Sequence, residues 1–465
     1  MRKFREAYRM QKDLTKGNPY KVILLFALPM LVSMLFQQMY NIADSVVVGK
    51  FVGEDALAAV GASYPVTMIF LGFATGAGIG CSVVISQVFG AKDMRKLKTT
   101  ICTAMLGILG LCVVVTLIGI FTSGALLRLL KTPDNIFADS KTYLDVYIFG
   151  LFFLFMYNAA TSVFQALGNS RLPLFLLIFS SLFNIVLDVV FVYNFKMGVA
   201  GVAWATFIAQ GISCVLANVC LLVQVARIKG EGFRLFDFSI FKTCAVVAVP
   251  SILQSTIVSV GQLLVQGLIN SYGSTVIAGY SAAIKVNTSI IMILMTVANA
   301  VSSYTAQNCG AGNLERIRQG FKVGIVLSYA VAIVCAACVG IWADQLIGLF
   351  IDAEGAGVIE VGRSFLLILI PGYFLVNLKT VSDSVMRGCG DMVAFMISTL
   401  IDLILRVGLS YLLAFLMGSY LGIWWAYPIG WLVGMVVSLL LYRHGKWKRA
   451  VLENAAHTAN GASAE

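Results

Sequence analysis

The chain of 465 residues contains twelve apolar stretches of about 20 residues, separated by short polar breaks. A stretch of this length crosses a membrane as a helix, because a helix satisfies all of its backbone polar groups internally. Only 12% of the residues are charged, whereas soluble domains contain about 25%. We therefore expect an all-α polytopic membrane protein with twelve transmembrane helices. The stretches lie at about residues 22–47, 55–80, 100–122, 143–166, 172–193, 199–225, 244–269, 276–303, 323–345, 364–386, 392–416 and 420–441.

Lys and Arg residues are distributed unequally between the two sides of the expected membrane. The side that holds both termini and every second loop carries 24 of them, the opposite side carries six, and three lie within the stretches. Because basic residues collect on the cytoplasmic side, we expect both termini in the cytoplasm and the chain in the cell membrane. This distribution accounts for the net charge of +11 without a nucleic-acid partner. The lipid bilayer and small molecules are the expected partners of a monomer.

The second half of the chain repeats the first. QVFGAKDMRK at 87–96 and QNCGAGNLER at 307–316 are 220 residues apart, and Pro29 and Pro250 are 221 apart. We therefore expect two pseudo-symmetric six-helix lobes, 1–225 and 243–441, joined by a cytoplasmic linker, 226–242, and followed by a cytoplasmic tail, 442–465. Parallel six-helix repeats are common in alternating-access transporters. Both prolines interrupt helical hydrogen bonding, which makes them hinge candidates.

Glycines recur every four residues in the second stretch, at Gly72, Gly76 and Gly80. Such small-residue steps let the backbones of two membrane helices approach closely. We interpret them as positions of tight helix packing within the first lobe.

Five charged residues lie well inside the stretches of the second half. Lys379 with Asp383, and Asp402 with Arg406, are spaced i,i+4 and can form ion pairs on one helix face. Lys285 has no such partner on its own helix. The sequence leaves open whether these charges line a cavity or only stabilise the structure.

Two acids, Asp44 and Asp188, lie well inside the stretches of the first half, and none of these six stretches contains a basic residue. Asp188 lies about 24 Å along its helix from the expected cytoplasmic end, and Asp44 falls in the same outer half of the membrane. Asn184 and Tyr40 each precede one of these acids by one helical turn, and Thr206 lies at a comparable depth. Oxygen-rich groups of this kind suit a cation or proton site. The alternative is a set of buried hydrogen bonds between helices.

Several motifs together resemble the multidrug and toxic compound extrusion (MATE) family over about residues 15–445. The motifs are QQMYNIADSVVVGKFVGEDALAAVG at 37–61, the QxxGA loops at 87–91 and 307–311, NIVLD at 184–188 and RGCGD at 387–391. The resemblance implies multidrug efflux of amphipathic, cationic compounds in exchange for H⁺ or Na⁺, with no other cofactor and no structural metal. It implies a coupling site in the first lobe, formed by Asp44, Asn184, Asp188, Thr206, Tyr40 and Asn158.

Members of the NorM type also use acids in the seventh and tenth helices. Here the seventh stretch contains no Asp or Glu between residues 250 and 270, and Asp383 lies near the cytoplasmic end of the tenth. We therefore expect coupling through the first lobe alone.

Two other functions remain open. A flippase for a lipid-linked saccharide has a related architecture, and Lys285, Lys379 and Arg406 are the residues that favour it. An intramembrane aspartyl protease would use Asp44 and Asp188. Because no histidine lies within a stretch and no HExxH, GxSxG or P-loop motif occurs, we expect a transporter rather than an enzyme.

Overall fold

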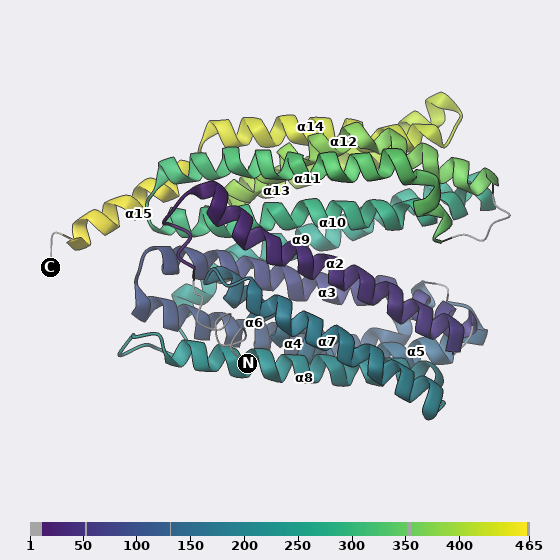
Figure 1. The fold of residues 1–465 in the computed structure, drawn as a ribbon, viewed down its shortest axis with the longest axis horizontal. Helices are drawn as coiled ribbons and strands as arrows, with labels where there is room; N and C mark the ends of the chain where they lie inside the picture. Colours follow the sequence, from purple (N-terminus) through teal and green to yellow (C-terminus); the bar gives the residue numbers. More distant parts are fainter. Residues whose placement is uncertain (1–11, 52–53, 131, 351–355, 463–465) are drawn as a thin grey trace. The chain divides into compact units, whose positions relative to one another are not determined.

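The computed structural model describes residues 12–51, 54–130, 132–350 and 356–462, and the side chains at 41–51, 54–58, 259, 356 and 457–462 lie outside this description. The described residues form helices joined by short turns, and no strand occurs among them (Figure 1). The helices of the first half are α2 (Pro19–Phe51), α3 (Glu54–Gly90), α4 (Met94–Leu129), α5 (Asp134–Phe149), α6 (Leu151–Ala166), α7 (Arg171–Val189), the π-helix η1 (Val190–Asn194) and α8 (Gly198–Ala226). Those of the second half are α9 (Phe238–Ile269), the 3₁₀ turn η2 (Asn270–Tyr272), α10 (Ser274–Gly310), α11 (Leu314–Gly348), α12 (Ala356–Gly388), α13 (Met392–Met417), α14 (Leu421–His444) and α15 (Trp447–Ala462).

Twelve membrane spans are confirmed when one bent helix pair counts as a span. Within the described residues, 11 helices are long and apolar enough to cross a membrane, and α5 and α6 pass the same test together. The pair is bent by 47° where Gly150 separates the two helices. Sequence hydropathy indicates only 143–166 for this span, because the first two turns of α5 carry the charged residues Asp134, Asp139 and Lys141.

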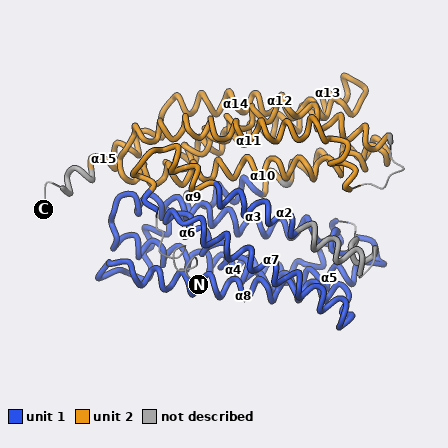
Figure 2. The backbone as a smooth tube through the Cα atoms, in the orientation of Figure 1, with its two compact units in different colours: residues 1–13, 28–255 blue, residues 14–27, 256–465 orange. Residues whose placement is uncertain are grey.

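The chain divides into two compact units, which Figure 2 shows in different colours. Unit 1 contains Met1–Asp13 and Leu28–Ser255, and unit 2 contains Leu14–Ala27 and Thr256–Glu465. The units differ from the two sequence repeats at the first helix of each repeat. The start of α2 is part of unit 2, and the start of α9 is part of unit 1.

The glycine steps of α3 pack against the part of α9 that belongs to unit 1. A methyl group added at Gly80 would lie 2.3 Å from Ala248 Cα, and one at Gly76 would lie 2.8 Å from Ile252 Cα. The two backbones are thus in direct contact, which small residues allow. The partner helix comes from the second sequence repeat, so this contact joins helices of the two repeats within unit 1.

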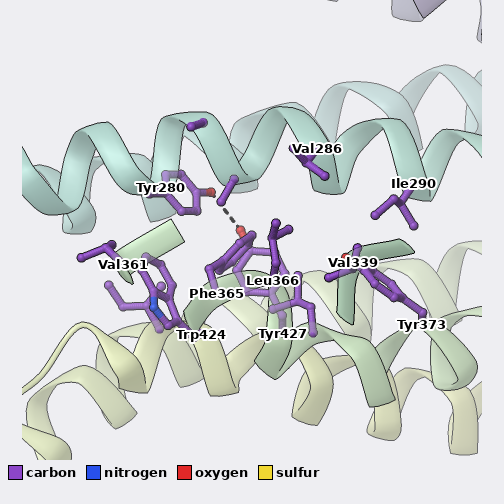
Figure 3. Close-up of a cluster of buried hydrophobic side chains, with 14 of the residues drawn as sticks. Tyr280, Val286, Ile290, Val339, Val361, Phe365, Leu366, Tyr373, Trp424 and Tyr427 are labelled. Carbon is purple, nitrogen blue, oxygen red and sulfur yellow. Dashed lines mark hydrogen bonds between the residues drawn. The ribbon is translucent and has the colours of Figure 1, made fainter. Parts of the chain in front are cut away.

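An aromatic cluster forms the core of unit 2 between α10, α12 and α14 (Figure 3). The Tyr280 ring stacks on Trp424 with a centroid distance of 5.5 Å, and Phe365 meets both rings edge-on. The hydroxyls of Tyr280 and Tyr427 are 3.1 Å apart, so the two buried polar groups satisfy each other. This packing gives three long helices one fixed register.

Both hinge candidates lie inside helices, Pro29 in α2 and Pro250 in α9. The Ser33 hydroxyl donates to the Pro29 carbonyl at 2.8 Å. Pro29 follows the point at which α2 passes from unit 2 to unit 1. Their role as hinges stays a prediction.

Candidate ion-coupling site

Asp188 lies in the last turn of α7, and its side chain is completely buried within unit 1. The next five residues form the π-helix η1 instead of continuing the α-helix. π-turns are rare and occur frequently at functional sites. The irregular backbone thus begins directly after the carboxylate that the sequence singles out.

The Asn184 amide contacts Asp188 from one turn earlier in α7. With the amide oriented to match its neighbours, Nδ2 donates to Asp188 Oδ2 at 2.8 Å, and Oδ1 accepts from the Thr206 backbone N–H at 3.2 Å. Asn184 is itself only 2% exposed. The amide therefore connects the carboxylate to α8 in an interior where water does not compete for the hydrogen bonds.

Thr206 takes part through its main chain, whereas the sequence suggests its hydroxyl. The contact with Asn184 uses the backbone N–H, and the side chain is half-buried. Sequence spacing gives the depth of a residue along its helix, but it does not tell which atom faces the neighbouring helix.

The other residues of the expected site lie in α6 and α2. The Asn158 side chain is half-buried and donates to Leu154 O of its own helix at 2.8 Å. Tyr40 in α2 is half-buried. Asp44 also belongs to α2, and its side chain lies outside the described part of the chain. Of the expected site residues, the structure thus describes a direct contact for Asn184 with Asp188 and with the Thr206 amide, and their role in coupling stays a prediction.

In unit 2, the predicted ion pair of Lys379 and Asp383 forms within α12, with 2.8 Å between Nζ and Oδ2. The second acid, Asp402 of α13, lies 3.9 Å from the same Nζ. All three residues are buried, and a cavity-lining role for them stays a prediction. Their charges compensate one another in the protein interior, where an unpaired charge would be costly.

The expected pair of Asp402 and Arg406 is replaced by contacts with other helices. The Asp402 carboxylate forms its ion pair with Lys379. The Arg406 guanidinium lies 5.4 Å from the centre of the Tyr427 ring. Lys285 is exposed, and its Nζ lies 5.3 Å from the centre of the Phe350 ring. Spacing along one helix does not predict these partners, because they come from neighbouring segments.

Sequence reasoning missed two polar contacts near this pair. The Ser438 hydroxyl of α14 donates to Asp383 Oδ1 at 2.6 Å. Arg387 is buried and donates to Asn299 Oδ1 at 2.7 Å. Its position in the RGCGD motif was the available signal.

The family model MatE matches the chain twice, at residues 29–190 and 250–412. The two matches begin 221 residues apart, as the two prolines do. Each half therefore carries the family pattern independently, which confirms the repeat.

Curated bacterial proteins are similar to this chain over most of its length. The Bacillus subtilis protein named "Probable multidrug resistance protein YpnP" is 29% identical over 94% of this chain and 97% of its own length. "Multidrug export protein MepA" of Staphylococcus saprophyticus is 23% identical over 81% of this chain and 83% of its own.

The fold matches that of solved transporters. A structure titled "Outward-facing conformation of a multidrug resistance MATE family transporter of the MOP superfamily" has a TM-score of 0.87 and 25% identity, and covers 95% of this chain and 98% of its own. A MOP superfamily transporter from Pyrococcus furiosus has a TM-score of 0.87 and 24% identity over 93% of this chain and 96% of its own. The chain is thus a multi-pass membrane protein that belongs to the MATE family of multidrug efflux transporters.

Proposed function

We propose that the chain is a secondary active exporter that exchanges amphipathic, cationic drug-like compounds for H⁺ or Na⁺ by alternating access. The observation that carries this proposal is the buried Asp188 with its Asn184 amide inside a membrane-spanning unit. A carboxylate in such a place is expensive to keep unless it has a function. Its environment suits the reversible binding of one small cation.

The proposed cycle uses the negative charge of this site. In the outward-facing state Asp188, together with Asp44 of α2, takes up the coupling ion and the drug leaves. In the inward-facing state the ion is lost to the cytoplasm, and the site is ready for the next drug molecule. One charge moving down 100 mV supplies about 2.3 kcal/mol, enough for a gradient of roughly fiftyfold.

The same proposal includes the topology. Both termini lie in the cytoplasm of a cell with this protein in its plasma or inner membrane, and the monomer is the working unit. Support comes from the 24 basic residues on the side of the termini. No resident cofactor takes part, and the coupling ion is a transported species.

The contacts in unit 2 argue against lipid-linked saccharide flipping. Lys379 forms ion pairs with the carboxylates of Asp383 and Asp402. The Arg406 guanidinium lies over the Tyr427 ring. Of the three basic residues that favour a flippase, Lys285 alone is exposed. One exposed lysine is a poor match for a pyrophosphate group, which usually requires several basic side chains.

Transport in proteoliposomes tests the proposal. Purified protein is reconstituted, a Na⁺ or an H⁺ gradient is imposed separately, and uptake of cationic and neutral dyes is followed. We expect one of the two gradients to drive transport of the cationic dyes and Asp188→Asn to abolish it. Asp145→Asn is the matched control, since this half-buried acid on α5 forms an i,i+4 ion pair with Lys141.

Gradient-driven transport that survives in Asp188→Asn would contradict the coupling role. The wild-type protein could instead move no dye under either gradient and translocate a lipid-linked saccharide in the same vesicles. That result would contradict the exporter and support the flippase.

A further inference from the structure

A short strap, residues 14–17, precedes α2 and is bound firmly within unit 2. Leu14 is completely buried, and its N–H donates to Gln307 Oε1 at 2.9 Å. Its carbonyl accepts from Asn308 Nδ2 and from Arg316 Nη2, both at 3.3 Å. A segment without regular secondary structure thus has both polar groups of this backbone position satisfied by side chains.

Arg316 is the centre of this contact. Nη1 donates to Gly17 O at 2.9 Å, Nη2 donates to Leu14 O, and Nε donates to Asn308 Oδ1 at 3.1 Å. The guanidinium also lies 5.7 Å from the centre of the Tyr304 ring. Lys could not replace this arrangement, because the planar fork makes several directed hydrogen bonds at once.

Unit 1 contains a similar contact ahead of α9. Arg95 Nε donates to Gly232 O at 2.9 Å. Farther along the same segment, the backbone N–H groups of Arg234 and Asp237 donate to the hydroxyls of Thr99 and Thr103. The segment before α9 is therefore held along the first turns of α4.

The two contacts share details that the repeat alone does not require. Arg95 and Arg316 each lie in the first helical turn after a side-chain cap, Asp93 for α4 and Asn313 for α11. Each binds the carbonyl of a glycine in the left-handed region, with φ of +84° at Gly17 and +68° at Gly232. The same kind of contact, an arginine that binds a glycine carbonyl ahead of a long helix, thus occurs in both units. Its recurrence indicates that the two arginines have the same role.

We propose that Arg316 and Arg95 are positioning residues of the transport cycle, which anchor the starts of α2 and α9 in every state. The inference rests on the proposed transport function. Residues 14–27 belong to unit 2, while the rest of α2, which carries Tyr40 and Asp44, belongs to unit 1. Ion binding can reach unit 2 along α2 only if the start of this helix is held there.

Hydrogen–deuterium exchange on the full-length protein in nanodiscs tests the anchor directly. We expect Arg316→Gln to accelerate exchange in residues 12–18 by about ten- to a hundredfold, the factor expected from losing hydrogen bonds to a charged group. Arg318→Gln is the matched control, with the same charge change on the same helix at a side chain that is 51% exposed. In the wild-type protein, protection of this segment should persist under both gradient directions.

Ion-driven transport by the same variants tests the positioning role. Arg316→Gln should lower the maximal rate at least tenfold while the apparent affinity for the coupling ion stays unchanged, and Arg318→Gln should alter neither. Gly17→Val, which keeps the arginine, should act like Arg316→Gln, because a β-branched residue disfavours positive φ. Gly17→Asn should retain activity, because Asn tolerates it.

Protection of residues 12–18 that disappears under one gradient direction would overturn the anchor. Faster exchange in Arg316→Gln or Gly17→Val without a change in the maximal rate would overturn the positioning role. Absence of any ion-driven transport in the wild-type protein would instead contradict the proposed function, and the exchange data would still decide on the anchor.

Discussion

Lys379 Nζ lies 2.8 Å from Asp383 Oδ2, and each of these two side chains is 6% exposed. Lys379→Met should destabilise the protein by about 3–5 kcal/mol, because it leaves buried carboxylates without a counter-charge. Thermal unfolding in detergent measures the effect. Lys141→Met, which removes an exposed i,i+4 pair with Asp145, should change stability by at most about 1 kcal/mol. Equal losses in the two variants would contradict the buried pair.

Asn184→Ala should weaken the apparent affinity for the coupling ion by about tenfold or more, because a hydrogen bond to a charged carboxylate is lost. The measurement is the ion dependence of transport in proteoliposomes. Asn218→Ala in α8 is the control, since this amide donates mainly to Cys214 O of its own helix at 2.8 Å. If both variants keep the wild-type ion affinity, the Asn184 contact has no part in coupling.

Gly80→Ala should destabilise unit 1 by about 1–3 kcal/mol, since the added methyl group would lie 2.3 Å from Ala248 Cα. Gly110→Ala in α4 meets nothing within 4 Å and should be neutral or stabilising by up to about 1 kcal/mol. Melting temperatures of the two variants check the prediction. A neutral Gly80→Ala would mean that α3 and α9 are less closely packed.

Neighbouring tryptophans in α14 provide a test of the aromatic core. Trp424 is fully buried against Tyr280 and Phe365, while Trp425 is 43% exposed. Trp424→Ala should cost about 3–5 kcal/mol, and Trp425→Ala should have a small effect. Unfolding of both variants in the same detergent gives the comparison, and a reversed order would contradict the register of α14.

Hydropathy predicts the number of spans, and motifs that recur at one offset predict the repeat, because both depend on residues spread over the whole chain. They do not predict how the chain divides into units. The starts of α2 and α9 are packed on units that hold most of the other repeat, and this depends on tertiary contacts such as Gly80 with Ala248. Helix spacing likewise predicts Lys379 with Asp383 but not Lys379 with Asp402.

The contact between Asn184 and Asp188 could be predicted from the sequence, whereas the atoms that make it and the partner of Asn158 could not. Asn184 and Asp188 stand out in the sequence because they are polar, lie one helical turn apart and interrupt an apolar stretch. In the structure Asn184 Nδ2 lies 2.8 Å from Asp188 Oδ2. The main-chain role of Thr206 required the position of α8 beside α7. Nothing in the residue types of VFVYN indicates a π-helix at that point.

The π-helix after Asp188 has a consequence for how this site tolerates changes in chain length. A π-turn holds one more residue than an α-turn, so η1 is equivalent to a single-residue insertion in an ordinary helix. Deleting one residue within Val190–Asn194 would let this segment continue as a regular α-helix, and the residues beyond it would keep nearly their present orientation, because the wider turn holds the extra residue. The chain directly after Asp188 should therefore tolerate the loss of one residue better than an ordinary turn of α7 would.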